Sequence, residues 1–230
     1  MVVAAAATAA VSDVQSLLRR ARGLSGLTLR ELAERLGAEP PSDARREKGY
    51  IGRLVERALG AAGSGAIDFP ALGIELKTLP VDALGRPKES TFVCHADLRR
   101  LADLDWERSR VCEKLAHVLF VPIESRSGIA FGARRVGAAF LWRPSEEQRA
   151  LLRADYEEIA GRVGLGEIET LDGRVGRVMQ TRPKAANARA RARAADANGA
   201  SQVTFPRAFY LRASFTRQLL AEAFAAPNAL

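Results

Sequence analysis

An Asp and a Glu-x-Lys triplet stand close together in an apolar stretch of this chain. Asp68 is followed seven residues later by Glu75, and Lys77 completes the pattern. Ile74 and Leu76 alternate with the two charged residues, so a β-strand would bury one pair and point the other to its opposite face. Carboxylate oxygens suit Mg²⁺, and a neighbouring Lys can orient or deprotonate an attacking water. The pattern therefore favours a metal-dependent nuclease.

The flanking segments favour such a site over the alternative, an ordinary half-buried strand with a charged outer face. Residues 50–60 have apolar side chains at helical spacing, and Glu56 lies near that stripe. Glu56 is therefore a candidate third carboxylate. Residues 78–87, directly after the expected strand, are rich in turn-forming residues, as expected where a site opens to substrate.

The chain is strongly basic, with 35 Lys and Arg residues against 27 Asp and Glu residues and a net charge of +8 over 230 residues. Most of the excess is Arg, whose planar fork can bind two phosphate oxygens at once. This balance favours a polyanionic partner, most simply nucleic acid, over a basic protein with no such partner. At 47% hydrophobic residues, the chain can bury the core of one domain, or of two lobes of one domain.

Two cysteines and two histidines are too few for a disulfide framework, a zinc site or a His-based metal site. Cys94 and Cys112 are expected to be small core residues in strands, in a reducing compartment. His95 and His117 lie far apart in the sequence and are expected to have structural roles. The acidic and Lys residues above therefore remain the candidates for chemistry.

The Ala-rich stretch over residues 1–11 lacks the basic start of a signal peptide and is expected to be a disordered or frayed tail. Residues 12–230 are expected to form a single domain built as two lobes. No run is long and apolar enough to span a membrane, and we expect a cytoplasmic protein.

Turn residues and hydrophobic periodicity divide the chain into helices and strands. Helices are expected as a pair over about 12–36, and over 50–60, 146–163 and 215–224, with Ser145 and Ser214 as N-caps. Strands are expected at 74–77, 91–96, 111–124 and 209–211, with a further hairpin at 173–179. Arg189, Arg191 and Arg193 are expected on a solvated helix face, with weak attraction to phosphate. The mixture indicates an α/β protein with a mixed sheet flanked by helices.

Residues 28–37 look like the first helix of many helix-turn-helix modules. A recognition helix should follow after a short turn, but Pro40 and Pro41 discourage a helix there. A non-enzymatic DNA-binding regulator built on this segment is therefore an alternative function. It would leave Asp68, Glu75 and Lys77 unexplained.

Six blocks of sequence, taken in order, carry a more specific signal. They are residues 48–52, 68–82, 91–94, 134–137, 181–188 and 206–211. Together they resemble the MutH family, the DNA endonucleases of methyl-directed mismatch repair, from about Leu17 to Phe224. The resemblance implies a restriction-endonuclease-like fold whose two lobes form a cleft around duplex DNA.

The resemblance also implies an activity and partners. The expected reaction is Mg²⁺-dependent nicking of the unmethylated strand at hemimethylated GATC, on the 5′ side of the G. The expected partners are the mismatch-repair ATPase MutL, which activates the enzyme, and indirectly the mismatch sensor MutS. The free protein is expected to be a monomer.

Residue roles follow from the resemblance position by position. Asp68 and Glu75 match the metal-binding carboxylates, and Lys77 matches the catalytic lysine. Glu56 matches a helix carboxylate near the same catalytic site. Lys48 and Lys114 resemble basic residues that approach the DNA or the catalytic centre. Arg182 and Pro183 fall in the base-reading loop, Phe92 resembles a DNA-contacting position, and Tyr210 matches the residue that senses adenine methylation.

These recognition roles are chemically reasonable, because Arg can bond two acceptors on a guanine edge and a Tyr ring can reject the added methyl group of adenine. Without the resemblance, Arg182 would be interpreted as a solvated charge in a loop or a nonspecific phosphate contact, and Tyr210 as an aromatic core residue of its strand. The chain departs from the superfamily pattern at Ile67, where a Pro commonly precedes the Asp. A restriction enzyme that cuts both strands at GATC would share the catalytic residues and is a further alternative.

Overall fold

The computed structural model describes residues 11–38, 49–62, 65–185, 187, 189–196, 198 and 200–225. The expected tail over residues 1–11 lies outside these, apart from Val11. The chain divides into two compact units. The first unit combines Met1–Lys88 with His117–Trp142, and the second combines Glu89–Ala116 with Arg143–Leu230.

The first unit is built on a three-stranded mixed sheet. Its strands β1 (Glu75–Val81), β3 (Val118–Glu124) and β4 (Phe140–Trp142) lie in the order β1-β3-β4. β1 runs parallel to β3, and β4 runs antiparallel to β3. Six of the seven residues of β3 are buried, so its unbroken apolar sequence belongs to the central strand of the sheet.

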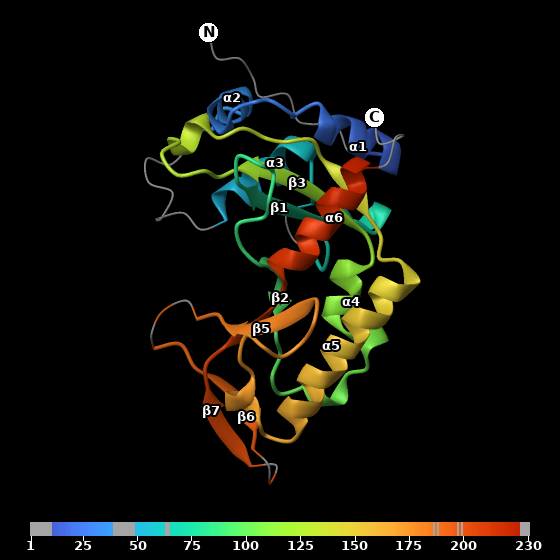
Figure 1. Ribbon diagram of the computed structural model, residues 1–230, viewed down its shortest axis with the longest axis vertical. Coiled ribbons are helices and arrows are strands. Elements are labelled where there is room, and N and C mark those ends of the chain that lie inside the picture. Colours follow the sequence, from blue (N-terminus) through green and yellow to red (C-terminus); the bar gives the residue numbers. More distant parts are fainter. Residues whose placement is uncertain are drawn as a thin grey trace. The chain divides into compact units, whose positions relative to one another are not determined.

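Three helices pack with this sheet around one core (Figure 1). They are α1 (Val14–Arg22), α2 (Leu29–Arg35) and α3 (Tyr50–Leu59), with short 3-10 turns at η1 (Pro70–Leu72) and η4 (Phe131–Ala133). Thr28 caps α2 in a reciprocal capping box with Glu31, which explains where that helix begins. The helices expected over residues 12–36 and 50–60 are confirmed.

The second unit contains a separate three-stranded sheet and a two-stranded ribbon. Strands β2 (Thr91–His95), β8 (Arg207–Leu211) and β5 (Met179–Pro183) are antiparallel in the order β2-β8-β5. β6 (Ala192–Ala195) and β7 (Ser201–Thr204) pair antiparallel as the ribbon. The helices are α4 (Arg110–Leu115), α5 (Glu146–Gly164) and α6 (Ala213–Ala225), with 3-10 turns η2 (Leu101–Asp103), η3 (Trp106–Arg108) and η5 (Ile168–Thr170).

Helix α5 is the long helix of the second unit. Ser145 caps it in a capping box with Gln148, as the sequence predicted. Its apolar stripe packs on one face of the β2-β8-β5 sheet, where the Tyr156 and Phe209 rings stack with centroids 5.8 Å apart. Tyr210 follows Phe209 in β8, so its side chain points to the opposite face of that sheet. The mixed α/β class expected from the sequence is confirmed.

The single strand expected over residues 111–124 is wrong in its first half. Ser109 accepts a hydrogen bond from the Cys112 N–H at 3.0 Å and starts helix α4, so the strand begins only at Val118. Cys112 therefore lies on a helix, whereas Cys94 is buried in β2 as expected.

The helix expected for the Ala/Arg tract is also wrong. Residues 192–195 pair with β7 instead, across a turn in which the Asp196 carboxylate accepts N–H bonds from Asn198 and Ala200 at 2.9 and 2.8 Å. Such a side-chain bond to the backbone favours a turn over a helix.

Two further boundaries differ from the prediction. The expected hairpin over 173–179 is a turn, and the strand starts only at Met179. Helix α6 starts at Ala213, because the Thr216 N–H bonds the Arg212 carbonyl at 3.1 Å. Ser214 therefore lies inside the first turn and does not cap it. Among the described residues, every helix is too short or too polar to cross a membrane.

Candidate functional site

Glu75 and Lys77 lie on one side of β1, as expected for residues two apart in a strand. The Lys77 Nζ atom lies 2.5 Å from Glu75 Oε1. Lys77 and Glu75 are only 9% and 3% exposed, so this is a buried ion pair and not a charged outer face. A buried charged pair is expensive to desolvate, so its presence favours a functional role over a purely structural one.

Asp68 is folded back against the same strand. Its Oδ2 atom accepts a hydrogen bond from the Leu76 N–H at 2.8 Å, between the two charged residues of β1. The fold-back is made by η1 and by Gly73, whose φ of +64° suits glycine. Phe69 and Ile74 close it with two backbone hydrogen bonds of 2.9 and 3.2 Å. The seven-residue spacing seen in the sequence is therefore the length of one tight turn.

Glu56 reaches the same place from α3, which packs on β1. The pKa of the Glu56 carboxyl is raised, first because burial disfavours its charged form and next because the charges of Asp68 and Glu75 repel it. Lys77 opposes this rise. Three carboxylates and one ammonium group therefore interact electrostatically in the first unit, and we call this set the acidic cluster.

The acidic cluster fits a magnesium ion better than a structural metal. Within the described residues, no three His, Cys, Asp or Glu side chains are placed to hold a metal by themselves. Mg²⁺ needs no such cage, because it keeps several waters and is commonly held by one or two carboxylates together with substrate phosphates. Asp68 and Glu75 would supply those carboxylates.

The second unit presents a different set of side chains on the face of its three-stranded sheet that lies opposite α5. Phe92 and Gln180 both lie opposite Tyr210 in the register, so all three share that face. The Phe92 and Tyr210 ring centroids are 5.7 Å apart. Lys184 Nζ lies 3.5 Å from the Phe92 centroid and 5.8 Å from that of Tyr210. Arg182, two residues beyond Gln180, completes this aromatic and basic cluster.

Gln180 holds the Arg182 side chain in place. With its amide oxygen facing Arg182, it accepts hydrogen bonds from Nη2 at 3.0 Å and Nε at 3.3 Å, and from the Ser90 hydroxyl at 2.9 Å. Gln180 is only 1% exposed, whereas Arg182 is exposed. A buried amide therefore holds a guanidinium that solvent can reach. A guanidinium held on one edge keeps its other donors for a ligand.

Tyr210 has a partly desolvated ring. The pKa of its phenol is raised, first by burial and further by the negative charge of Glu89, while Arg182 opposes the rise. The pKa of the neighbouring His95 is lowered, first by burial and then by the positive charge of Lys184. Neutral aromatic rings beside fixed cations suit contact with the bases and phosphates of a nucleic acid.

The sequence-predicted residues thus fall into two clusters, one in each unit. Glu56, Asp68, Glu75 and Lys77 form the first, and Phe92, Arg182 and Tyr210 belong to the second. Pro183 is exposed at the end of β5, and Lys114 is partly buried on α4. Lys48 lies outside the described residues.

Lys184 and Gln180 were missed by the sequence analysis. Gln180 could have been found from the strand period, because it stands two residues before Arg182 and must share its face. Lys184 stands inside the sequence block 181–188, yet only the fold brings its ammonium over the ring of Phe92.

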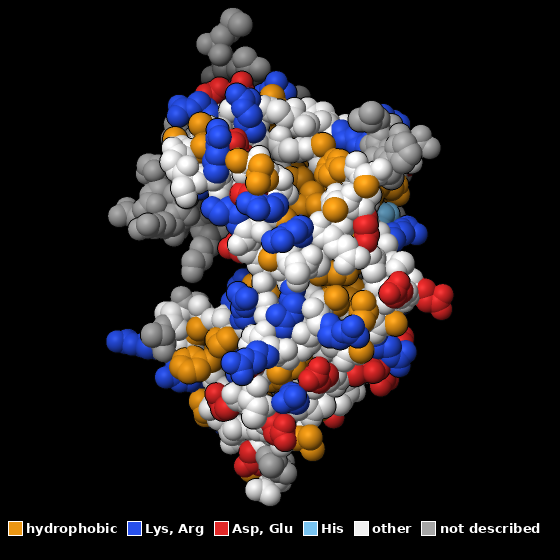
Figure 2. All heavy atoms as spheres, viewed as in Figure 1, with side chains coloured by type: hydrophobic (Ala, Val, Ile, Leu, Met, Phe, Trp, Pro, Cys, Tyr) orange, Lys and Arg blue, Asp and Glu red, His pale blue; other side chains and the backbone are white. Residues whose placement is uncertain are grey.

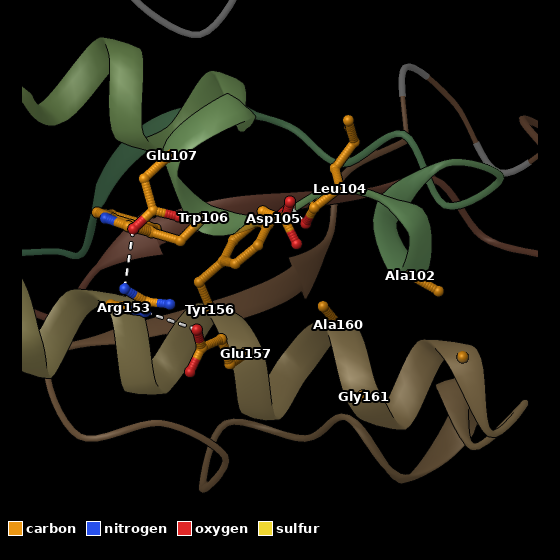
Figure 3. A pocket seen from close by; sticks show the side chains of 11 residues that line it. Ala102, Leu104, Asp105, Trp106, Glu107, Arg153, Tyr156, Glu157, Ala160 and Gly161 are labelled. Atoms are coloured by element: carbon orange, nitrogen blue, oxygen red, sulfur yellow. Dashed lines mark hydrogen bonds and ion pairs between the residues drawn. The ribbon is translucent and has the colours of Figure 1, made fainter.

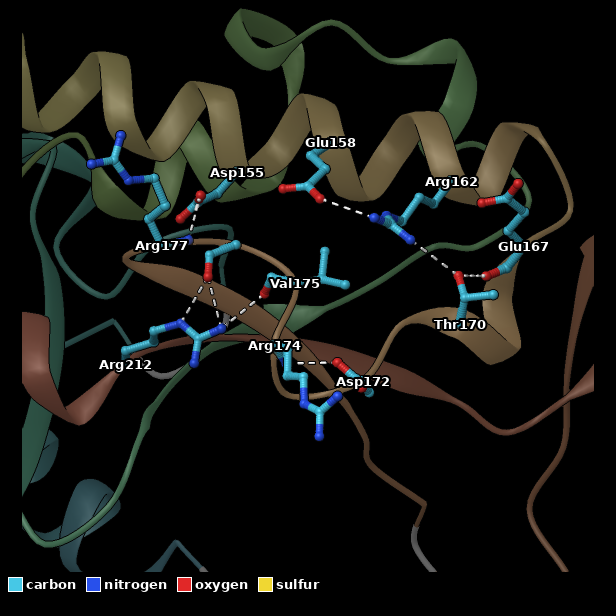
Figure 4. A network of polar contacts seen from close by, with 11 residues as sticks. Asp155, Glu158, Arg162, Glu167, Thr170, Asp172, Arg174, Val175, Arg177 and Arg212 are labelled. Carbon is cyan, nitrogen blue, oxygen red and sulfur yellow. Dashed lines mark hydrogen bonds and ion pairs between the residues drawn. The ribbon is translucent and has the colours of Figure 1, made fainter.

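A buried polar network fastens the turn that leads into β5 (Figure 4). Asp155 on α5 accepts three backbone N–H bonds of 2.7 Å, from Arg177, Val178 and Met179. Arg212 donates to the carbonyls of Gly173, Val175 and Gly176 at 2.7 to 3.1 Å. The turn before the strand that carries Gln180 and Arg182 is therefore held at both its amides and its carbonyls.

A pocket of about 310 Å³ lies elsewhere in the second unit, between α5 and the segment containing η2 and η3 (Figure 3). Arg153 stands at its rim, 2.8 Å from a Glu107 oxygen and 2.7 Å from a Glu157 oxygen. The Tyr156 hydroxyl donates to the Leu104 carbonyl at 2.9 Å. Because these polar groups are already paired and no sequence-predicted site residue lines the pocket, we assign chemistry to the two clusters instead.

Comparisons with known proteins point the same way. A family model described as DNA mismatch repair enzyme MutH matches residues 60–155, a range that includes Asp68, Glu75 and Lys77. Proteins named DNA mismatch repair protein MutH from Salmonella paratyphi B, Salmonella newport and Salmonella typhimurium are each 51% identical over 214 residues. Each alignment covers 92% of this chain and 93% of the relative.

Proposed function

The chain belongs to the MutH family of DNA mismatch repair enzymes, and on that basis we propose that it is a Mg²⁺-dependent endonuclease. Its proposed substrate is duplex DNA with a hemimethylated GATC sequence, of which it nicks the unmethylated strand. The observation that carries the proposal is the buried Lys77–Glu75 pair with Asp68 bonded to the strand between them.

The acidic cluster supplies the residues for phosphodiester hydrolysis. When bound, Mg²⁺ would act as a Lewis acid that stabilises the charge developing on the phosphate. Asp68 and Glu75 would hold it with oxygens whose positions are fixed by β1. Lys77 would orient the attacking water and take part in its deprotonation, and its own position is set by Glu75. Glu56 would add negative potential that favours the cation.

The aromatic and basic cluster supplies the residues for base reading. Arg182 is exposed, positioned by Gln180, and has donors for the two acceptors on a guanine edge. Tyr210 and Phe92 form an aromatic surface beside it, on which a methyl group added to adenine N6 would meet a ring. Lys48, Lys114 and Pro183 are proposed as further DNA contacts.

Tyr210→Ala is expected to weaken discrimination between methylation states more than it weakens cutting. The smaller side chain leaves room for the methyl group, so a difference of about 10-fold or more between unmethylated and methylated strands should shrink toward equality. Nicking rates on the three methylation states of one duplex measure this. An unchanged preference would reject the role of Tyr210.

Gln180→Leu is expected to lower the preference for GATC over a single-base variant of the site by about 10-fold, because Arg182 loses the acceptor that orients it. Gln180→Glu keeps an acceptor for the guanidinium and is the matched control, expected to retain more of the preference. Equal losses in both variants, or none in either, would contradict a positioning role for Gln180.

The proposed activity is tested with matched duplexes that carry one GATC, unmethylated, hemimethylated or fully methylated, in Mg²⁺ with and without MutL. Nicking confined to unmethylated strands and stimulated by MutL is the expected result. Efficient double-strand cutting without MutL would favour the restriction enzyme instead. Binding without any cleavage would favour the regulator built on residues 28–37, whose second helix would fall largely outside the described residues.

MutL and, through it, MutS are the proposed protein partners, as expected for a member of this repair family. A monomeric state when free and a cytoplasmic location stay predictions. Sedimentation of the free protein measures the first, and MutL-dependent stimulation of nicking measures the partnership.

A further inference from the structure

The β6–β7 ribbon is an excursion between the two strands that carry the recognition residues. Arg182 lies on β5 before it, and Tyr210 lies on β8 after it. A hydrogen bond of 2.7 Å from the Lys184 N–H to the Pro206 carbonyl closes the base of the excursion. The ribbon is therefore joined directly to the aromatic and basic cluster, within the second unit (Figure 1).

One face of the ribbon is fixed to the end of α5 and the segment after it. Ala194 is buried on this face, opposite Gln202, whose amide donates to the Gly166 carbonyl at 3.3 Å. The Thr204 hydroxyl donates to Glu169 Oε1 at 2.9 Å. These contacts leave only the other face of the ribbon for a ligand.

That outer face combines guanidinium groups with exposed apolar side chains. Arg193 lies opposite Val203, and the Arg191 guanidinium lies 4.8 Å from the Phe205 ring centroid. Val203 and Phe205 are 60% and 44% exposed, so this face presents apolar side chains to solvent beside the guanidinium groups. Figure 2 shows basic and hydrophobic side chains together at the left of the second unit, at the height where Figure 1 draws the connection from β5 to β6, with acidic side chains lower down near the ribbon.

The charge on this face suits an anion. Arg189, Arg191 and Arg193 are all exposed, and Arg193 Nη1 contacts the neutral Ser201 hydroxyl at 3.3 Å. The carboxylate of Asp196 is engaged with the backbone of its own turn. Guanidinium groups bind phosphate oxygens, and apolar groups between them can pack on deoxyribose, so the sugar-phosphate backbone of duplex DNA matches both features.

The ribbon extends away from the strands that carry the recognition residues. The three steps from Val203, which lies opposite Arg193, to Pro206 span about 10 Å at roughly 3.3 Å per residue. Duplex DNA rises about 3.4 Å per base pair, so a ribbon lying along the duplex would offset Arg193 by roughly three base pairs from the recognition strands. That offset is close to the length of a four-base-pair site, and it would bring Arg193 to the DNA at the edge of the site.

We propose that the outer face of the β6–β7 ribbon binds the phosphate backbone of DNA flanking the recognition site, with Arg191 and Arg193 as the phosphate ligands, an inference that rests on the proposed DNA substrate. The contact carries no sequence information. It lengthens the footprint of the enzyme and adds two phosphate contacts to its salt-dependent affinity.

The test compares Arg191→Ala/Arg193→Ala with the full-length wild-type protein, by binding to duplexes of about 30 and about 8 base pairs over a range of salt. On the long duplex, the slope of log affinity against log salt should become less steep by roughly 0.9 per contact, about 1.8 in all. The affinity of the variant should be roughly 10- to 30-fold lower than that of the wild type near 0.15 M salt. The loss should be the same for GATC and unrelated sequences, and nearly absent on the short duplex.

Two matched variants separate charge from structure. Arg153→Ala/Arg162→Ala removes the same charge from α5, which packs on the other face of the three-stranded sheet, and should leave the slope nearly unchanged. Arg191→Lys/Arg193→Lys keeps the charge and should keep most of the slope. A slope that falls equally in the α5 variant, or as far in the Lys variant as in the Ala variant, overturns the proposal.

The outcome is independent of whether the chain cuts at GATC. If the wild-type protein binds DNA without cleaving it, the proposed activity fails, while the change in slope still decides the role of the ribbon. If the Ala variant keeps the wild-type slope but loses stimulation by MutL, the ribbon contacts a protein and the DNA proposal is overturned.

Discussion

Lys77→Ala is expected to lower the rate of nicking by roughly 10³-fold or more, while affinity for a GATC duplex stays within about 3-fold of wild type. The ammonium group lies 2.5 Å from a Glu75 oxygen, inside the acidic cluster. Removing it takes away the group that is proposed to position the attacking water, without touching the aromatic and basic cluster that would bind the bases. Single-turnover nicking in Mg²⁺ and binding in a chelator measure the two quantities.

A loss of folding must be separated from a loss of chemistry in this variant. Lys77→Ala leaves the Glu75 carboxylate buried without its ammonium partner, which in other buried pairs costs about 3–5 kcal/mol. Glu75→Gln/Lys77→Met removes both charges at similar volume and is expected to be more stable than the single variant, yet equally inactive. Thermal unfolding of both variants makes the comparison. Full nicking activity in a folded Lys77→Ala protein would sink the catalytic assignment.

The acidic cluster was predictable from sequence because its geometry is local. Glu75 and Lys77 share a face by the period of a strand, and one turn at Gly73 brings Asp68 back to the Leu76 amide. Their burial was not predictable, since it depends on β3 and α3 covering β1 from other parts of the chain. The sequence therefore identifies the residues of the cluster, and only the fold shows the buried ion pair.

Errors in the elements arose where a local polar bond outweighed the hydrophobic pattern. The apolar run after Val111 reads as one strand, but the Ser109 cap starts a helix and delays the strand to Val118. Residues 189–193 alternate small and basic residues, which suits a strand period as well as a helix. Pairing with β7, a segment the sequence left unassigned, decided between them.

The contacts that hold Arg182 and the turn before it were the hardest to foresee. Gln180 accepts hydrogen bonds from the Arg182 guanidinium and the Ser90 hydroxyl. Asp155 accepts hydrogen bonds from backbone amides 22 to 24 residues away. A backbone amide that bonds a side chain cannot be identified from the sequence, because every residue type except Pro offers the same N–H. Asp155 in the apolar stripe of α5 was the available signal, since a carboxylate there must be satisfied by something.

Asp155→Ala is expected to lower the free energy of unfolding by about 3–5 kcal/mol, because three amides would be left in a buried place without their acceptor. Asp155 is 2% exposed, so water can reach these amides only if the turn opens. Denaturant unfolding measures the change. Glu158→Ala is the matched control, since it removes an exposed carboxylate from the same helix together with its ion pair to Arg162, and it should change stability by about 0.5 kcal/mol or less.

The same Asp155 substitution should also weaken recognition of the bases. This second effect distinguishes Asp155, which holds the turn before β5, from an ordinary core residue. The amides held by Asp155 belong to the residues directly before Gln180, so opening the turn frees the start of β5 and with it the Arg182 side chain. Hydrogen exchange at the three amides, those of residues 177–179, should therefore rise first, at denaturant concentrations where the sheet of the first unit stays protected. Preference for GATC should fall in parallel. Wild-type exchange at these three amides in the variant would show that another group holds the turn, and that Arg182 is positioned by Gln180 alone.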